Sequence, residues 1–168
     1  MDGSHATLLA ALLLLGCGGT AAAPATAGTP DALAGPPRPW AELGPDERRQ
    51  HMVHEVLPRA SAMFAEHDPQ RYADFSCATC HGPDAQARGF AMPNPSLYPL
   101  SPTGSARQHQ TVRDHPEMVR FMYGRLVPAM ETMLGAQRYD EATGEGFTCY
   151  ACHPHAEPDG PTTQPVAD

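Results

Sequence analysis

The sequence predicts a small, mainly α-helical protein with two helix–loop units and long loops rich in proline and glycine. Two segments carry apolar residues at helical spacing, and each is followed by a loop and a Cys-x-x-Cys-His pattern. Proline and glycine number 19 and 15 in a chain of 168 residues, so much of the chain must be turn, loop or linker. A chain of this length favours one domain, or one domain plus a tail.

The first predicted helix follows from an apolar stripe that begins at Met52. Pro45 and the two acidic residues after it suit the start of this helix, because proline and acidic side chains are favoured in a first turn. The stripe recurs at the spacings expected of one helix face. It consists of Met52, Val53, Val56, Leu57, Ala60, Met63 and Phe64.

The second predicted helix begins near Asp114. Asp114 and Glu117 have the spacing of a capping box, and Gly135 suits the helix end. Pro58 and Pro128 should each kink or divide their helix, because proline clashes with the carbonyl four residues earlier. The apolar stripe consists of Met118, Val119, Met122, Leu126, Val127, Met130, Met133 and Leu134.

The two halves of the chain share a sparse repeat. Three pairs of residues match at a constant offset of 70: Met52 and Met122, Pro58 and Pro128, Met63 and Met133. After two inserted residues, an aromatic–hydroxyl–cysteine sequence recurs at residues 75–77 and 147–149. We expect repeat units at about 45–82 and 114–154, inside a folded domain at 40–153.

The N-terminus resembles a secretion signal. An apolar run ends in Leu-Leu-Gly before Cys17 and is shorter than the roughly 20 residues that span a bilayer. This ending resembles the bacterial lipobox, which implies a signal peptide at 1–16 and lipidation of Cys17. The first five residues contain Asp2 and no Lys or Arg, which departs from the signal pattern. An ordinary signal peptide with an incidental cysteine is the alternative, and both predict export.

The segments outside the folded domain have the composition of linkers. Residues 17–39 lack periodic apolar positions and are expected to form a disordered tether rich in Ala, Pro and Gly. Residues 154–168 contain four prolines and are expected to form a disordered tail. The formal charge of −8 disfavours nucleic acid as a partner and suggests basic protein surfaces instead.

Four of the five cysteines form two Cys-x-x-Cys pairs, and a histidine follows each pair directly. The motifs are Cys77, Cys80 and His81, and then Cys149, Cys152 and His153. This is the attachment signature of haem c. Two thiols can form thioethers with one porphyrin, and the adjacent imidazole is then held beneath the iron. We therefore expect two covalently attached haems, with His81 and His153 as proximal iron ligands.

Three other interpretations of the cysteines fit less well. A zinc site usually closes a loop of roughly 15–20 residues, whereas 68 residues separate the two pairs. Disulfides in an exported chain would leave the two matching histidines unexplained. A thioredoxin-like redox motif needs a surrounding βαβ pattern, which the sequence does not predict.

The distal ligand of each iron has to come from elsewhere in the chain. No methionine follows the second motif, and His155 is too close to His153 to reach the opposite face of the same haem. The preceding helix therefore supplies the candidates for the second haem, Met130 or Met133. The repeat makes Met63 the matching candidate for the first haem.

A methionine on a helix that precedes its own Cys-x-x-Cys-His motif resembles the cytochrome subunit of bacterial photosynthetic reaction centres. The resemblance covers roughly Met52–His81 and Met122–His153, and it implies a dihaem c-type cytochrome, although the photosynthetic subunit usually has four such units. Mono-domain class I cytochromes take methionine from downstream, which would make Met92 the ligand of the first haem. Histidine ligation is the third option, with candidates His51, His54, His67, His109 and His115.

Two six-coordinate haems need no substrate site. We therefore expect a carrier of single electrons between redox partner proteins, anchored to the membrane by a lipid and facing the periplasm, and no enzymatic activity. A dihaem peroxidase-like enzyme and a haem-based sensor are the alternatives, and each would need one open iron coordination position.

Overall fold

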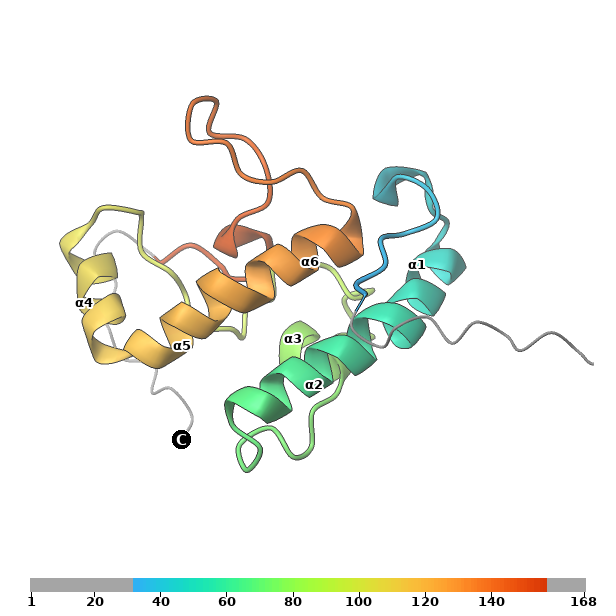
Figure 1. Ribbon diagram of the computed structural model, residues 1–168, viewed down its shortest axis with the longest axis horizontal. Coiled ribbons are helices and arrows are strands. Elements are labelled where there is room, and N and C mark those ends of the chain that lie inside the picture. The colour runs from blue at the N-terminus through green and yellow to red at the C-terminus, as the bar shows by residue number, and fades with distance from the viewer. Residues whose placement is uncertain (1–31, 157–168) are drawn as a thin grey trace, which may run out of the picture. The chain divides into compact units, whose positions relative to one another are not determined.

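The computed structural model describes residues 32–156, and its regular structure is helical (Figure 1). Among these residues, β-structure is limited to isolated bridges, so the prediction of a mainly α protein is confirmed. No helix in this part of the chain is long and apolar enough to cross a membrane. The elements are η1 (Trp40–Glu42), α1 (Pro45–His51), η2 (Met52–Val56), α2 (Leu57–His67), α3 (Cys77–His81), α4 (Ala106–Asp114), α5 (Pro116–Phe121), η3 (Met122–Leu126), α6 (Val127–Leu134) and η4 (Cys149–Ala151).

The predicted signal peptide at 1–16, Cys17, most of the expected tether and residues 157–168 of the expected tail lie outside the described residues. The described part of the expected tether, residues 32–39, contacts the folded part of the chain, although it precedes the expected domain start at Trp40. Arg59 donates to the carbonyl of Ala32 at 3.4 Å. Pro36 lies so close to Gly135 that a Cβ on this glycine would be 3.1 Å from the proline ring.

Both predicted helices are present, and a π-helical segment interrupts each one just before its proline. Leu57 donates its N–H to the carbonyl of Met52, and Val127 does the same to Met122, so each bond spans five residues. Proline lacks an N–H and clashes with the carbonyl four residues earlier, and the wider π turn accommodates the ring without ending the helix. The two interruptions are separated by the same offset as the sequence repeat.

The predicted start of the first helix is confirmed, and the predicted start of the second is wrong. α1 begins at Pro45 as expected, and Glu47 accepts the Gly44 N–H at 2.9 Å. The capping box on Asp114 is wrong, because Asp114 ends the unpredicted helix α4 and its carboxylate accepts from Gln110 at 2.7 Å. α5 begins instead at Pro116, whose ring disfavours helical backbone at the residue before it.

The two interrupted helices pack in antiparallel fashion. His51 at the end of α1 hydrogen-bonds the carbonyl of Met133 near the end of α6, with Nε2 at 2.6 Å from the oxygen. The ring of Phe64 in α2 contacts that of Phe121 in α5, with centroids 5.0 Å apart. The buried centre between the helices consists of Val56, Ala129 and Met133, with Met52, Met63, Met130 and Leu134 packed against it.

Candidate haem-binding site

The first Cys-x-x-Cys-His motif forms α3, a single helical turn. Cys77, Cys80 and His81 stand three and four positions apart, so the turn brings both thiols and the imidazole to one face. Gly82 ends the turn with φ 84° and donates to the carbonyl of Ala78 at 2.8 Å. This left-handed backbone favours glycine, because other residues clash there through their Cβ.

The second motif forms a tight turn of a different kind. η4 is a 3₁₀ turn whose N-cap, Thr148, accepts the N–H of Tyr150 on Oγ1 at 3.3 Å. The N–H groups of Cys152 and His153 both donate to the carbonyl of Cys149, at 3.1 and 2.9 Å. The second motif thereby folds its two thiols and its imidazole into one compact turn.

All four motif cysteines are free thiols, and three of them are half-buried while Cys77 is exposed. Burial above all, together with the nearby thiols of Cys152 and Cys77, raises the pKa of Cys80 to about 12. Burial also raises the pKa of Cys149 and of Cys152. These three thiols are therefore protonated at neutral pH.

Burial likewise favours the neutral form of both motif histidines. It lowers the pKa of His81, an effect that the backbone of Phe90 opposes and the Arg88 charge reinforces. Burial also lowers the pKa of His153, against the opposing effect of the Tyr98 backbone. A histidine must be neutral to bind a metal, so both imidazoles are in the form that iron requires.

The two histidines differ in what holds their second ring nitrogen. Nδ1 of His153 hydrogen-bonds the carbonyl of Tyr98 at 2.9 Å, which leaves Nε2 free. Nδ1 of His81 is buried and lacks a hydrogen bond of standard geometry within residues 32–156. The ring of Phe90 stands edge-on to His81, with centroids 5.6 Å apart.

The loop between α3 and α4 lies beside the second motif. Leu100 donates to the carbonyl of Pro154 at 2.9 Å and accepts from the N–H of Ala156 at 2.8 Å. The hydroxyl of Tyr150 donates to the carbonyl of Ser101 at 2.8 Å. Asn94 in the same loop hydrogen-bonds both motifs. The fold therefore brings together two motifs that are distant in the sequence.

The candidate distal methionines differ in burial. Met133 is fully buried with no exposed surface, whereas Met63 and Met130 are half-buried against the same core. Met92 is half-buried in the loop that follows the first motif.

The histidines considered as distal ligands have varied surroundings. His51 is buried and bonded through Nε2 to the Met133 carbonyl, and His67 stacks on Phe121 with centroids 4.4 Å apart. His115 lies edge-on to the ring of Tyr98 at 6.4 Å. The remaining two, His54 and His109, are exposed.

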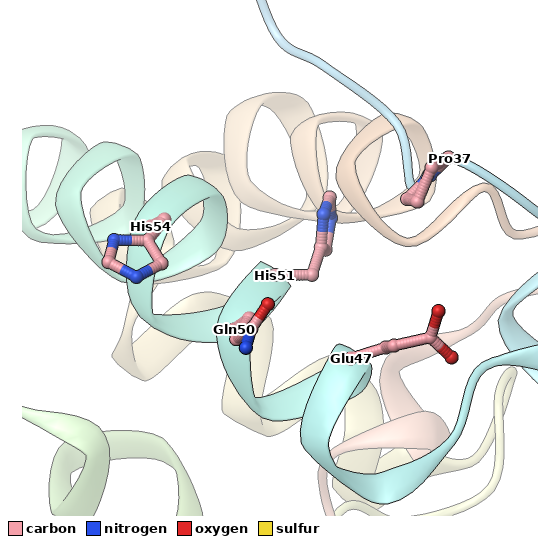
Figure 2. A pocket seen from close by; sticks show the side chains of 5 residues that line it. All are labelled: Pro37, Glu47, Gln50, His51 and His54. Atoms are coloured by element: carbon pink, nitrogen blue, oxygen red, sulfur yellow. The ribbon is translucent and has the colours of Figure 1, made fainter.

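A shallow hollow of about 290 Å³ lies beside α1 and is lined by no residue of either motif. Figure 2 shows its lining side chains, which come from α1, the following π segment and the chain before η1. They are Pro37, Glu47, Gln50, His51 and His54. Nowhere in residues 32–156 do three His, Cys, Asp or Glu side chains gather as a multi-ligand metal site requires. A haem iron takes only two ligands from the protein.

No protein-family model matches this sequence, and neither the curated proteins nor the solved structures contain a match. The resemblance to the reaction-centre cytochrome subunit thus stays a prediction.

Sequence reasoning missed four residues around the motifs. The motifs are supported, through backbone conformation or hydrogen bonds, by Gly82, Arg88, Asn94 and Tyr98. Gly82 could have been noticed because it follows the first motif directly. Asn94 is the chain's only asparagine and stands between two prolines, but no sequence spacing links it to Cys152. Tyr98 acts through its carbonyl, which leaves no signal in the sequence.

Proposed function

We propose that this chain is a dihaem c-type cytochrome that carries single electrons between redox partner proteins. The observation that carries the proposal is the pair of Cys-x-x-Cys-His motifs, each folded into one tight turn with free thiols and a half-buried imidazole. Haem supplies one-electron chemistry at its iron when bound, and the protein binds it and tunes its potential.

The four thiols would form the thioethers, and His81 and His153 would be the proximal ligands. Their lowered pKa values support the role, because a neutral imidazole has a nitrogen lone pair to give to iron. At His153, the Nδ1 bond to Tyr98 leaves Nε2 as the ligating atom and makes it more basic.

Met63 is the proposed distal ligand of the first haem, and Met92 is its rival. For the second haem the proposal keeps Met130 and Met133. The repeat favours Met133, because it matches Met63. Burial favours Met130, because Met133 is fully buried in the core. To reach an iron, the Met133 side chain would have to leave this core position and would create a cavity there. Removal of the true ligand should lower the potential of one haem and open that iron to carbon monoxide.

The proposed location is the periplasmic face of a membrane, with the chain anchored by a lipid on Cys17. The lipobox-like sequence supports export, and the formal charge of −8 supports a partner with a basic surface. Wild-type protein should partition into detergent, and Cys17→Ser should release it or block its processing. Recovery of the wild type only in the soluble periplasmic fraction would contradict the anchor.

The decisive experiment is a haem assay on purified protein. Denatured chain should retain two haems in a pyridine haemochrome assay, and acid acetone should extract none. Low-spin spectra without carbon monoxide binding at either iron would support the electron carrier. A high-spin ferric component that binds carbon monoxide would favour the peroxidase-like or sensor alternative. Bound zinc or extractable haem would overturn the proposal.

A further inference from the structure

Asn94 is a buried polar residue in the loop between α3 and α4, with 1% of its surface exposed. The prolines on both sides of it restrict the backbone at this point. A buried amide costs free energy unless its donors and acceptor are satisfied. The partners of Asn94 therefore show what this residue contributes.

The hydrogen bonds of Asn94 reach both haem-attachment motifs. Its Nδ2 donates to the carbonyl of Cys80 at 3.0 Å, and its backbone N–H donates to the carbonyl of Cys152 at 2.9 Å. Each of these cysteines directly precedes a proposed proximal histidine. Asn94 thus joins the two motifs through the carbonyl of the second cysteine in each.

The side-chain amide of Asn94 is held in a single orientation. Oδ1 accepts the N–H of Ser96 at 2.9 Å and an N–H of Arg88 at 3.4 Å. A flipped amide would set its NH₂ group against these two donors, and its oxygen against the carbonyl of Cys80. Arg88 also donates to the carbonyl of His81, and Asp84 fixes its guanidinium at 2.9 Å. The first motif is therefore tied to the loop at two successive carbonyls.

We propose that Asn94 is a positioning residue that fixes the separation and relative orientation of the two haem-attachment motifs. The bridge is a property of the polypeptide, and its consequence for electron exchange rests on the proposed function. Since electron exchange between two haems depends on their distance and orientation, a single residue would then control it, through its side chain at Cys80 and its backbone N–H at Cys152.

The first test measures amide hydrogen exchange in the purified full-length protein by NMR. Asn94→Ala removes the side-chain amide, and Asn94→Asp keeps the side-chain acceptor but loses the donor to Cys80. Both variants keep the backbone N–H that bonds Cys152. Either variant should raise exchange at Leu100 and Ala156, beside the second motif, by about tenfold, the factor that corresponds to about 1.4 kcal/mol. The matched control is Ser105→Ala, which removes the side-chain cap of α4 at 3.1 Å and touches neither motif.

The second test uses Soret circular dichroism of the holoprotein, because two haems held at a fixed angle give a two-signed signal. Both Asn94 variants should weaken this signal, and Ser105→Ala should retain it. Wild-type signal and wild-type exchange in both Asn94 variants would overturn the proposal. If Asn94→Ala does not fold, the isosteric Asn94→Asp decides alone. A wild type without covalent haem would overturn the proposed function, while hydrogen exchange would still decide the bridge.

Discussion

The two motifs share one five-residue pattern, yet the protein supports them differently. The first lies on an α-helical turn that ends in a left-handed glycine, and Nδ1 of its histidine lacks a standard hydrogen bond within residues 32–156. The second lies on a 3₁₀ turn, and Nδ1 of His153 hydrogen-bonds the carbonyl of Tyr98. The pattern predicts attachment, whereas the surrounding loop decides how each motif histidine is held.

The largest expected effect comes from removing one motif at a time. Changing Cys77 and Cys80 together to Ala should reduce the haem content from two per chain to one, and so should the same change at Cys149 and Cys152. The reason is that each haem depends on its own pair of thiols. Pyridine haemochrome assays check this outcome, and retention of two haems by either variant would contradict it.

The two single-haem proteins also sharpen the comparison between the histidines. A hydrogen bond from Nδ1 makes the imidazole more basic, which stabilises ferric iron. For distal ligands of the same kind, the haem bound through His153 should therefore have the lower reduction potential. Redox titration of the two variants measures this difference, and the reverse order would argue against control by the Tyr98 carbonyl.

The next largest effect concerns the matching methionines of the two units. Met133→Ala should lower the free energy of unfolding by about 2–5 kcal/mol, because it empties a fully buried core position. Met63→Ala should cost less, because Met63 is only half-buried. Thermal or denaturant unfolding measures both values. Equal losses would mean that the two positions are packed alike.

A smaller effect should follow from Gly82→Ala at the end of the first motif. Its φ of 84° is left-handed, and the new Cβ would lie 3.0 Å from Oδ1 of Asn94, so stability should fall by about 1–3 kcal/mol. Gly124→Ala is the control, because its added Cβ meets nothing within 4 Å beyond its own turn of helix. That change should stabilise the helix by about 0.5–1 kcal/mol. A neutral Gly82→Ala would show that the turn tolerates a side chain.

The smallest effect is expected at the ion pair that joins the two interrupted helices. Arg125 contacts Glu66 at 2.7 Å, with both side chains more than half exposed. Arg125→Ala should reduce stability by about 1 kcal/mol or less, because solvent screens exposed pairs. The loss should shrink further in high salt. A loss that is large and independent of salt would point to packing by the arginine stem instead.

Much of the local structure was predictable because it depends on neighbouring residues. The apolar stripes predicted both long helices, Pro45 and Gly135 marked helix ends, and Pro58 and Pro128 marked the interruptions. The capping box on Asp114 failed because Pro116 starts the helix two residues later and α4 had no apolar signal of its own. Helix starts depend on backbone preferences that several nearby residues can satisfy.

The residue pattern alone predicts the two Cys-x-x-Cys-His motifs as attachment sites, because two thioethers need two closely spaced thiols and the iron needs an imidazole next to them in the chain. Only the tertiary structure brings the motifs together through Asn94 and supplies the carbonyl of Tyr98 to His153. Two of these contacts, from Asn94 to Cys152 and from His153 to Tyr98, join residues at least 55 positions apart in the chain. In all of them the acceptor is a backbone carbonyl, a group that every residue carries. Side-chain identity cannot reveal such partners, because a carbonyl becomes selective only through its position in the fold.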